Sequence, residues 1–359
     1  MALIVQKYGG TSVGSVERIR NVAARVAATR AAGNDVIVVV SAMSGETNRL
    51  LALAAEISVQ PNPRETDVLV ATGEQVSVAL LAMALQEIGV PAVSLLGFQL
   101  PVLTSNVYGR ARIKSIEGGR MRSVLDSGSV AVVAGFQGVD AAASITTLGR
   151  GGSDTSAIAI AAAAKADVCE IYTDVEGVFT TDPRVCANAR KLDRISFEEM
   201  LELASLGAKV LQIRSVEFAK RYNIPVHVRS SFSDAPGTWV VEEEPGMEDV
   251  LVTGVAADRN EAKITLQRVP DRPGLAAKIF GPIAKAHIVV DMIIQNAAKD
   301  AEGRTDVTFT VAKTDMDRVR AHMDAILKSV DATGVRYDEA IAKVSIVGRN
   351  AERGEQRVD

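Results

Sequence analysis

The chain has 359 residues, 47% of them hydrophobic and 23% charged, which is long enough for two domains and too apolar for a disordered chain. Its net charge of -4 leaves no basic surface for a phosphate backbone, so we expect no nucleic-acid partner. Two cysteines, Cys169 and Cys186, and three histidines argue against a disulfide scaffold and against a metal site. The chain opens without a basic and apolar leader, and no apolar run reaches the roughly 18 residues that span a bilayer, so we expect a cytoplasmic protein with no membrane contact.

The first part of the chain alternates apolar runs of strand length with segments of helical period. We expect strands over residues 3–8, 36–40, 92–96, 130–136, 168–173 and 225–228. The helices between them are expected over residues 13–32, 66–86, 153–166 and 197–221. Continuous apolar strands separated by helices are typical of a parallel sheet covered on both faces, so the predicted fold class is α/β.

A change in composition between Ser230 and Asp249 marks a domain boundary, because a Ser-rich stretch with Pro-Gly is followed by three successive Glu. We therefore expect one domain over residues 1–230, a linker over 231–249 and a second region over 250–348. Within that region, strands over 262–268, 288–295, 307–312 and 342–347 and helices over 273–286 and 315–329 are expected. Their order, β-α-β-β-α-β, is typical of a ferredoxin-like α+β unit. Residues 349–359 are almost wholly polar and are expected to form a solvated tail.

A lysine and two glycines accompany the end of the first predicted strand. Lys7 lies near its carboxyl end, and Gly9 and Gly10 precede the first helix. This edge of a parallel sheet is where α/β proteins bind ligands, and backbone N–H groups at a helix start favour an anion such as phosphate. The segment matches neither of the common glycine-rich nucleotide motifs. The alternative is a tight turn at the glycines, with Ser12 as the cap of the helix.

A second glycine-rich segment, residues 147–156, leads into another helix. Arg150 can hold a carboxylate or a phosphate through two parallel hydrogen bonds. Asp154 can orient Lys7 or accept hydrogen bonds from backbone amides. The alternative is helix capping, to which Ser153, Asp154 and Thr155 are all suited.

Other polar residues lie beside predicted strands and helices. Glu74 begins a long apolar helix, where it can instead be an acid stabilised by the helix dipole. Asp182 and Pro183 can form a simple turn. His227 is surrounded by apolar strand residues, and we interpret it as a core residue. The residues at and after the end of the strand over 168–173 that could bind a ligand are Thr173, Asp174, Asp182 and Arg184.

The ordered occurrence of these segments resembles the aspartokinase family of amino acid kinases. The matching segments are Lys7-Tyr8-Gly9-Gly10-Thr11-Ser12, Val39-Val40-Ser41-Ala42-Met43, Thr72-Gly73-Glu74, Val133-Ala134-Gly135-Phe136-Gln137-Gly138, Thr147-Leu148-Gly149-Arg150-Gly151-Gly152-Ser153-Asp154-Thr155, Tyr172-Thr173-Asp174-Val175-Glu176-Gly177-Val178 and Ser196-Phe197-Glu198-Glu199-Met200. The resemblance extends from residue 2 to about residue 348. The second region looks like the ACT units that such kinases carry behind the catalytic domain.

The resemblance implies transfer of the γ-phosphoryl group of MgATP to the β-carboxylate of L-aspartate, which yields 4-phospho-L-aspartate for lysine, threonine and methionine synthesis. By analogy with the family, Lys7 neutralises the transferring group and Asp154 holds Lys7 in register. The residues implied to assist Lys7 are Gly9, Gly10 and Ser41. The residues implied to bind aspartate are Arg150, Glu74, Thr47 and Ser153. The residues implied to hold the nucleotide, which carries Mg²⁺, are Lys7, Gly9, Gly10, Thr173, Asp174, Asp182, Arg184 and Lys209.

The resemblance also implies feedback control by lysine, threonine or both. The expected effector site comprises Asp271, Arg272, Pro273, Gly274, Leu275, Asp291, Gln295 and Asn296. Pairing of ACT units between subunits implies a homodimer or a larger oligomer. After Gly348 the sequence departs from the family, whose members complete a second ACT unit there. We therefore expect an incomplete second unit and weakened feedback inhibition.

Two other functions fit part of the pattern. A related kinase that acts on glutamate, acetylglutamate, carbamate or UMP is disfavoured by the segments around Glu74 and Arg150 and by the ACT-like region. A non-catalytic amino-acid sensor is disfavoured by the joint presence of Lys7, Arg150, Asp154, Asp174 and Lys209.

Overall fold

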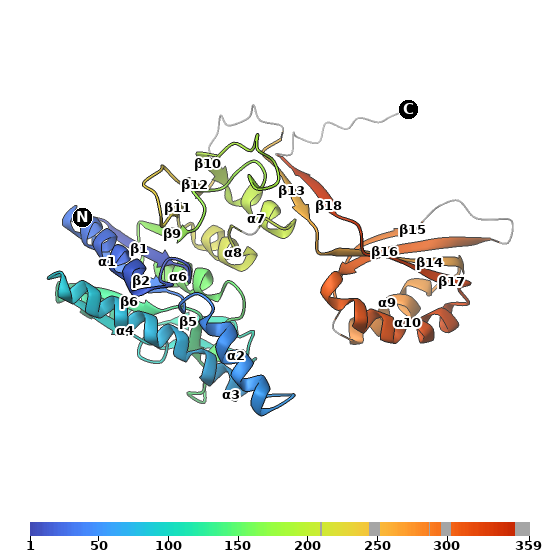
Figure 1. Ribbon diagram of the computed structural model, residues 1–359, viewed down its shortest axis with the longest axis horizontal. Helices are drawn as coiled ribbons and strands as arrows, with labels where there is room; N and C mark the ends of the chain where they lie inside the picture. The colour runs from blue at the N-terminus through green and yellow to red at the C-terminus, as the bar shows by residue number, and fades with distance from the viewer. Residues whose placement is uncertain (209, 244–251, 287, 296–302, 349–359) are drawn as a thin grey trace. The chain divides into compact units, whose positions relative to one another are not determined.

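The computed structural model describes residues 1–208, 210–243, 252–286, 288–295 and 303–348 (Figure 1). The chain divides into two compact units, one built from residues 1–254 with 346–348 and the other from Val255–Ser345. The first unit holds the predicted α/β domain, and the second holds the predicted α+β domain. The tail expected over 349–359 lies outside the described residues.

The first unit is organised around a twisted sheet of eight strands. Every neighbouring pair is parallel except β11 and β12. The strands, in spatial order, are β10 (Arg194–Ser196), β12 (Thr238–Val241), β11 (Val226–Ser230), β9 (Val168–Thr173), β1 (Leu3–Tyr8), β2 (Asp35–Val40), β6 (Val130–Ala134) and β3 (Ala92–Leu95). The predicted α/β class is confirmed, and all six predicted strands of this domain are present.

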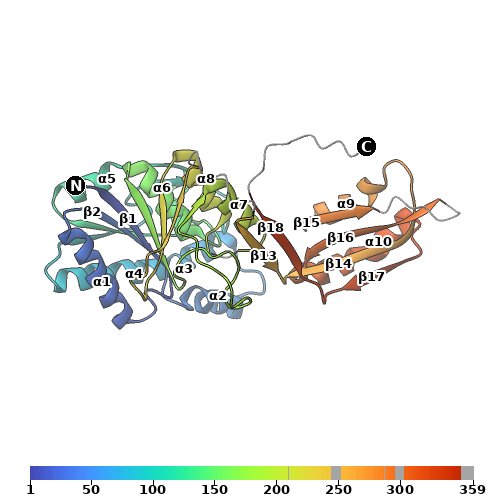
Figure 2. The same ribbon diagram turned by 90° about the horizontal axis from the view of Figure 1, so that it is seen from above.

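Helices cover both faces of this sheet (Figure 2). One face carries α1 (Val16–Ala31) and α4 (Thr72–Glu87), whose apolar residues share a core with alternate residues of β2 and β6. The opposite face carries α5 (Gly119–Asp126), α6 (Gly152–Ala164) and α8 (Ile213–Tyr222). Because the central strands are buried on both sides, their sequences are continuous apolar runs rather than alternating ones.

Two predicted helices are each divided in the structure. The segment expected over 66–86 forms α3 (Pro63–Val70) and α4. Together they make an apolar stretch long enough to cross a membrane, but half of its apolar window is buried inside the protein, as in a core helix. The segment expected over 197–221 forms α7 (Phe197–Ser205) and α8, because Gly207 adopts a positive φ of 108° that ends the first helix.

A smaller sheet and one further helix complete the first unit. The sheet has the order β5 (Ile113–Ile116), β4 (Val102–Thr104), β7 (Gln137–Val139) and β8 (Ile145–Thr147). Helix α2 (Glu46–Ile57) follows β2. The small sheet, α2 and α5 were not predicted. For the sheet the reason is that strands of three or four residues give too short a pattern to recognise.

The second unit contains an antiparallel sheet of four strands. Their order is β15 (Val290–Gln295), β16 (Arg304–Ala312), β14 (Glu261–Pro270) and β17 (Gly334–Asp338). Helices α9 (Leu275–Lys285) and α10 (Met316–Val330) share an apolar core with the sheet. The predicted β-α-β-β-α-β order is confirmed.

The last strand of that unit was assigned to the wrong residues. The sheet is completed by β17, whereas the expected strand over 342–347 corresponds to β18 (Lys343–Val347) and pairs with β13 (Gly254–Asp258). In β17, Val335 and Tyr337 alternate with Arg336 and Asp338, which is typical of a half-buried strand, so the sequence did hold a signal for it. β13 and β18 thus form a two-stranded sheet that is separate from the four-stranded one in the strand order, which agrees with the expected incomplete second unit.

Candidate active site

The carboxyl ends of β1, β2 and β9 meet at one edge of the large sheet. In the strand register, Tyr8 lies opposite Val40 on β2 and Tyr172 on β9. Just beyond the strands, Gly9 N donates to Tyr172 O at 3.3 Å and Ser41 N donates to Tyr8 O at 3.1 Å. Segments that are far apart in the sequence are therefore adjacent at this edge, where parallel sheets bind ligands.

Lys7 and Asp154 form an almost fully buried ion pair at this edge. Their Nζ and Oδ1 atoms are 2.6 Å apart, and each side chain is about one-tenth exposed. Asp154 lies in the first turn of α6, whose cap residue is Gly151 and lacks a side-chain cap bond. The alternative interpretation of Asp154 as the helix cap is therefore wrong, and its carboxylate is directed to Lys7 instead.

The glycines at this edge allow close approach of neighbouring backbone segments. A Cβ atom on Gly10 would lie 2.8 Å from Ala42 O, and one on Gly135 would lie 2.9 Å from Ser153 Oγ. Ser12 does not cap the first helix, because Ser15 accepts the hydrogen bond from Arg18 N. The glycine pair therefore interlocks with the segment after β2, which a simple tight turn does not require.

Glu74 is buried beside the same segment. Its Oε1 atom accepts a hydrogen bond from Ala42 N at 2.9 Å, and its side chain belongs to a residue that is only 3% exposed. Burial raises the pKa of Glu74 from 4.5 to about 7. It is therefore not an ordinary surface acid of the first helical turn, and such perturbed carboxyl groups are frequent at functional sites.

Arg150 lies on an exposed loop before α6. Gly149 and Gly151 on either side have φ values of 77° and 68°, a conformation that glycine adopts without strain. Within the described part of the chain, Arg150 forms no ion pair. Ser153 is buried two residues after this loop, and Thr47 is partly buried in the first turn of α2.

The residues predicted to hold the nucleotide lie after β9. Thr173 Oγ1 donates to Asp174 Oδ1 at 3.1 Å. Asp182 and Arg184 are bound to each other through two side-chain hydrogen bonds of 3.0 Å. Val185 N donates to Asp182 O at 2.9 Å, so the segment forms a turn, from which the side chains of Asp182 and Arg184 are exposed. Lys209 lies outside the described residues.

The predicted effector residues are only partly brought together. Gln295 Nε2 donates to Asp271 Oδ1 at 3.3 Å, which joins the end of β15 to the loop before α9. Gly274 is the cap residue of α9, with a φ of 86°. Asp291 pairs instead with Lys343 Nζ. Asn296 lies outside the described residues.

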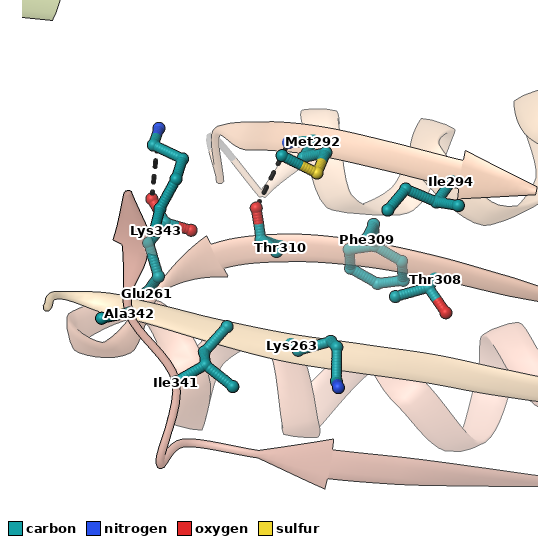
Figure 3. A pocket seen from close by; sticks show the side chains of 10 residues that line it. All are labelled: Glu261, Lys263, Met292, Ile294, Thr308, Phe309, Thr310, Ile341, Ala342 and Lys343. Carbon is teal, nitrogen blue, oxygen red and sulfur yellow. Dashed lines mark hydrogen bonds and ion pairs between the residues drawn. The ribbon is translucent and has the colours of Figure 1, made fainter. Parts of the chain in front are cut away.

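A shallow, mainly apolar cavity of about 240 Å³ lies on the sheet of the second unit (Figure 3). Lys343 and Glu261 lie together at one end of it, and Met292 and Ile294 from β15 line the rest. Its surface is mainly apolar, and the polar side chains along it are those of Glu261, Lys263, Thr308, Thr310 and Lys343.

Two residues at the base of the Arg150 loop had not been identified from the sequence. Asp67 in α3 accepts hydrogen bonds from the backbone and side chain of Thr147, and Arg214 in α8 donates to Leu148 O. A single acid within an amphipathic helix is usually a surface residue, so the pattern held no signal for Asp67.

Comparison with known proteins identifies the family. Residues 2–230 match the amino acid kinase family, and residues 264–328 match the ACT domain. An aspartate kinase from Pseudomonas putida is 57% identical over 349 residues, which cover 97% of this chain and 84% of that protein. The chain belongs to the aspartokinases. It is thus an aspartate kinase of the aspartate-family amino acid pathway, as predicted.

Two solved structures show what related aspartokinases bind. Escherichia coli aspartokinase III in complex with lysine and aspartate, in the T-state, has a TM-score of 0.77 and 29% identity, with coverage of 98% of this chain and 88% of that one. The same enzyme in complex with aspartate and ADP, in the R-state, has a TM-score of 0.76 and 28% identity, with coverage of 97% and 88%. The fold of both aspartokinase units is therefore the one expected.

Proposed function

We propose that this aspartokinase transfers the γ-phosphoryl group of MgATP to the β-carboxylate of L-aspartate and releases ADP and 4-phospho-L-aspartate. The observation that carries the proposal is the buried Lys7–Asp154 pair at the carboxyl edge of the sheet. In this reaction the β-carboxylate oxygen forms a bond to γ-phosphorus as the bond to the ADP oxygen breaks. Phosphoryl transfer needs alignment and neutralisation of negative charge rather than covalent participation of the protein.

Lys7 is the group placed to neutralise the transferring phosphoryl oxygens. Asp154 holds its ammonium in place, because a buried charge without a partner is strongly destabilising. The backbone of Gly9 lies close to the same point, since a Cβ atom on it would be 3.4 Å from Lys7 Nζ. Its N–H donates to Tyr172 O, so Gly10 is the glycine that can present an N–H group to the anion, and Ser41 follows the neighbouring strand. These four residues together suit an anion with several oxygen atoms.

The aspartate substrate carries both signs of charge, and the candidate pocket offers both. Arg150 has an exposed guanidinium that can bind a carboxylate through two parallel hydrogen bonds. Glu74 offers a buried carboxylate for the ammonium group of the substrate. Ser153 and Thr47 are assigned to the same pocket. The aspartate and ADP bound to the E. coli enzyme support this substrate pair.

For the nucleotide we assign Thr173, which ends β9, and Asp174, Asp182 and Arg184, which follow it, with Lys209 reaching phosphate. The Mg²⁺ ion arrives with ATP, where it neutralises phosphate oxygens and holds them in one geometry. The position of Thr173 at the end of β9, and of Asp174 just after it, agrees with nucleotide binding at the carboxyl edge of the sheet.

For regulation we propose an effector site at Asp271, Arg272, Pro273, Gly274 and Leu275, with Gln295 and Asn296 opposite. The lysine bound to the E. coli enzyme supports an amino acid as effector. The hydrogen bond between Gln295 and Asp271 shows that two parts of the predicted site are adjacent. Asp291 is directed to Lys343 and is the least favoured member. A homodimer in the cytoplasm and weakened inhibition by lysine or threonine remain predictions.

Product identity is the decisive test of the proposed reaction. The acyl phosphate is trapped with hydroxylamine in the presence of MgATP and either L-aspartate or L-glutamate. We expect aspartyl hydroxamate, with little product from glutamate. Equal products from both acids would support a related kinase instead, and absence of any ADP release would support a non-catalytic sensor.

A further inference from the structure

The base of the Arg150 loop is fixed by a buried acid from a distant helix. Asp67 in α3 is only 1% exposed. Its Oδ2 atom accepts from Thr147 N at 2.8 Å and its Oδ1 atom accepts from Thr147 Oγ1 at 2.7 Å. Both oxygens also accept from Gly109 N, at 3.0 and 2.9 Å. The carboxylate therefore has its hydrogen-bonding capacity filled by two segments.

The two segments, around Gly109 and Thr147, lie on either side of the start of the Arg150 loop. Thr147 ends β8 and also accepts a hydrogen bond from Ala111 N at 2.9 Å. Gly149 lies so close to the Gly109 segment that a Cβ atom on Gly149 would be 2.8 Å from Gly109 O. A displacement of Gly109 or Thr147 would therefore move Gly149, the residue next to Arg150.

A second contact restrains the residue between Thr147 and Gly149. Arg214 in α8 donates to Leu148 O at 2.8 Å and to Ala111 O at 3.1 Å. Leu148 N donates in turn to Phe136 O at 2.9 Å. The backbone up to Leu148 is thus held on every side, whereas Arg150 is exposed between two glycines.

We infer that Asp67 is a positioning residue for aspartate recognition, acting through Thr147 and Gly109 on the loop that presents Arg150. The inference rests on the proposed role of Arg150 as the carboxylate clamp. Arg150 is restrained by no ion pair within the described ranges, so the direction of its guanidinium depends on where the loop is anchored. A bidentate contact is sensitive to such placement, because both hydrogen bonds must be formed at once.

The test compares Asp67→Asn with the wild type. Asparagine has nearly the same shape, but its NH₂ group cannot accept the hydrogen bonds that one carboxylate oxygen receives. We expect the KM for aspartate to rise about tenfold, with kcat and the KM for MgATP changed less than about twofold. Thr147→Val removes one of the same bonds and should shift the KM for aspartate in the same direction by a smaller factor. It serves as the test if Asp67→Asn does not fold.

Asp140→Asn is the matched control. Asp140 is also largely buried and accepts from Ala142 N and Ser144 N, both at 2.9 Å, in the turn between β7 and β8. It also accepts from the Tyr108 hydroxyl at 3.2 Å, but this contact leaves the bonds of Gly109 N and Thr147 to Asp67 in place, so replacement of Asp140 should leave the KM for aspartate unchanged. An equal rise in this control would show that any loosening of the small sheet has the same effect, and it would overturn the inference.

A double-mutant cycle separates positioning from general stability. If Asp67 acts through Arg150, then Asp67→Asn should add little to the effect of Arg150→Lys. If the KM for aspartate of the double variant rises by the product of the two single factors, the inference is overturned. It is also overturned if Arg150→Lys raises the KM for aspartate and Asp67→Asn leaves it unchanged. An unchanged KM in Arg150→Lys itself would overturn the clamp and this inference together, so the two failures are distinguishable.

Discussion

Glu74 and Ala42 are joined by a hydrogen bond that uses only one of the two carboxylate oxygens. Ala42 N donates to Oε1 at 2.9 Å, while Oε2 is buried and has no hydrogen-bond partner within the described part of the chain. Burial dominates the balance and raises the pKa of the group to about 7. A substrate ammonium would supply the missing donors and favour the charged carboxylate.

The first prediction is a pH dependence of aspartate binding. Below about pH 7 the free enzyme holds Glu74 protonated, and a neutral carboxyl binds an ammonium group poorly. We expect the KM for aspartate to rise about tenfold per pH unit between pH 6.5 and 5.5 and to level off above pH 8. Glu74→Gln should have a high and nearly flat KM over this range. Steady-state kinetics at saturating MgATP measure the KM for aspartate at each pH. A wild-type KM that does not change with pH would contradict the assignment of Glu74 to the substrate ammonium.

The second prediction concerns stability. The folded protein binds the Glu74 proton more tightly than the unfolded chain, because folding raises the pKa from 4.5 to about 7. This contribution to the free energy of unfolding is present below pH 4.5 and is lost as the pH rises to 7. At pH 8, Glu74→Gln should therefore be more stable than the wild type, by up to about 3 kcal/mol. Urea denaturation at pH 5 and pH 8 checks this, and a gain that is equal at both values would point to another cause.

The third prediction concerns Lys7. Its charge matters most when negative charge is transferred, so Lys7→Ala should lower kcat by about a hundredfold or more and change the KM for aspartate far less. The variant also leaves Asp154 buried without its partner, so its folding must be checked by thermal denaturation. Lys114→Ala, at an exposed position of β5, is the control. Near-normal turnover by a folded Lys7→Ala protein would rule out the proposed mechanism.

The fourth prediction concerns Arg150. Arg150→Lys keeps the positive charge but loses the planar pair of donors, so the KM for aspartate should rise about tenfold or more while kcat changes less. The KM for MgATP should stay within about twofold of the wild type. A rise in the KM for MgATP alone would place Arg150 at the nucleotide rather than at aspartate.

The fifth prediction concerns the effector. Asp271→Ala removes the acceptor of the hydrogen bond from Gln295. Calorimetric titration with lysine and with threonine should show binding to the wild type that is weakened about tenfold in the variant. Asp291→Ala is the informative comparison, because Asp291 pairs with Lys343 and should matter less. Unchanged binding by Asp271→Ala would discard the proposed location.

The long apolar strands of the first unit were predictable because burial on both faces leaves a continuous hydrophobic run. The residues 36–40 and 130–134 are examples, and both are central strands. The short strands β4, β7 and β8 were not predictable. Each of them has only three residues, and an alternation of apolar and polar residues cannot be recognised over that length.

The candidate site shows the same division. Lys7 and Asp154 were recognisable as candidates because each lies beside glycines at a strand or helix end. Their pairing was predicted only from the resemblance to the family, and the structure joins them. Asp67 could not be found in this way, since its role depends on Gly109 and Thr147, which are remote in sequence. Sequence motifs identify the residues at the carboxyl edge of the sheet. The residues that hold them in place, such as Asp67, depend on tertiary packing, which a local sequence pattern does not encode.

The central position of β1 has a consequence for the synthesis of the chain. β1 is made first but lies between β2 and β9, and Gln6 bonds to Glu170, 164 positions later. Contacts so distant in sequence form slowly, and one edge of β1 stays unpaired on the ribosome until β9 emerges. During that interval Lys7 also lacks its acid partner until Asp154 has been added. A nascent or truncated chain that ends before α6 would therefore expose an apolar strand edge and depend on chaperones to avoid aggregation.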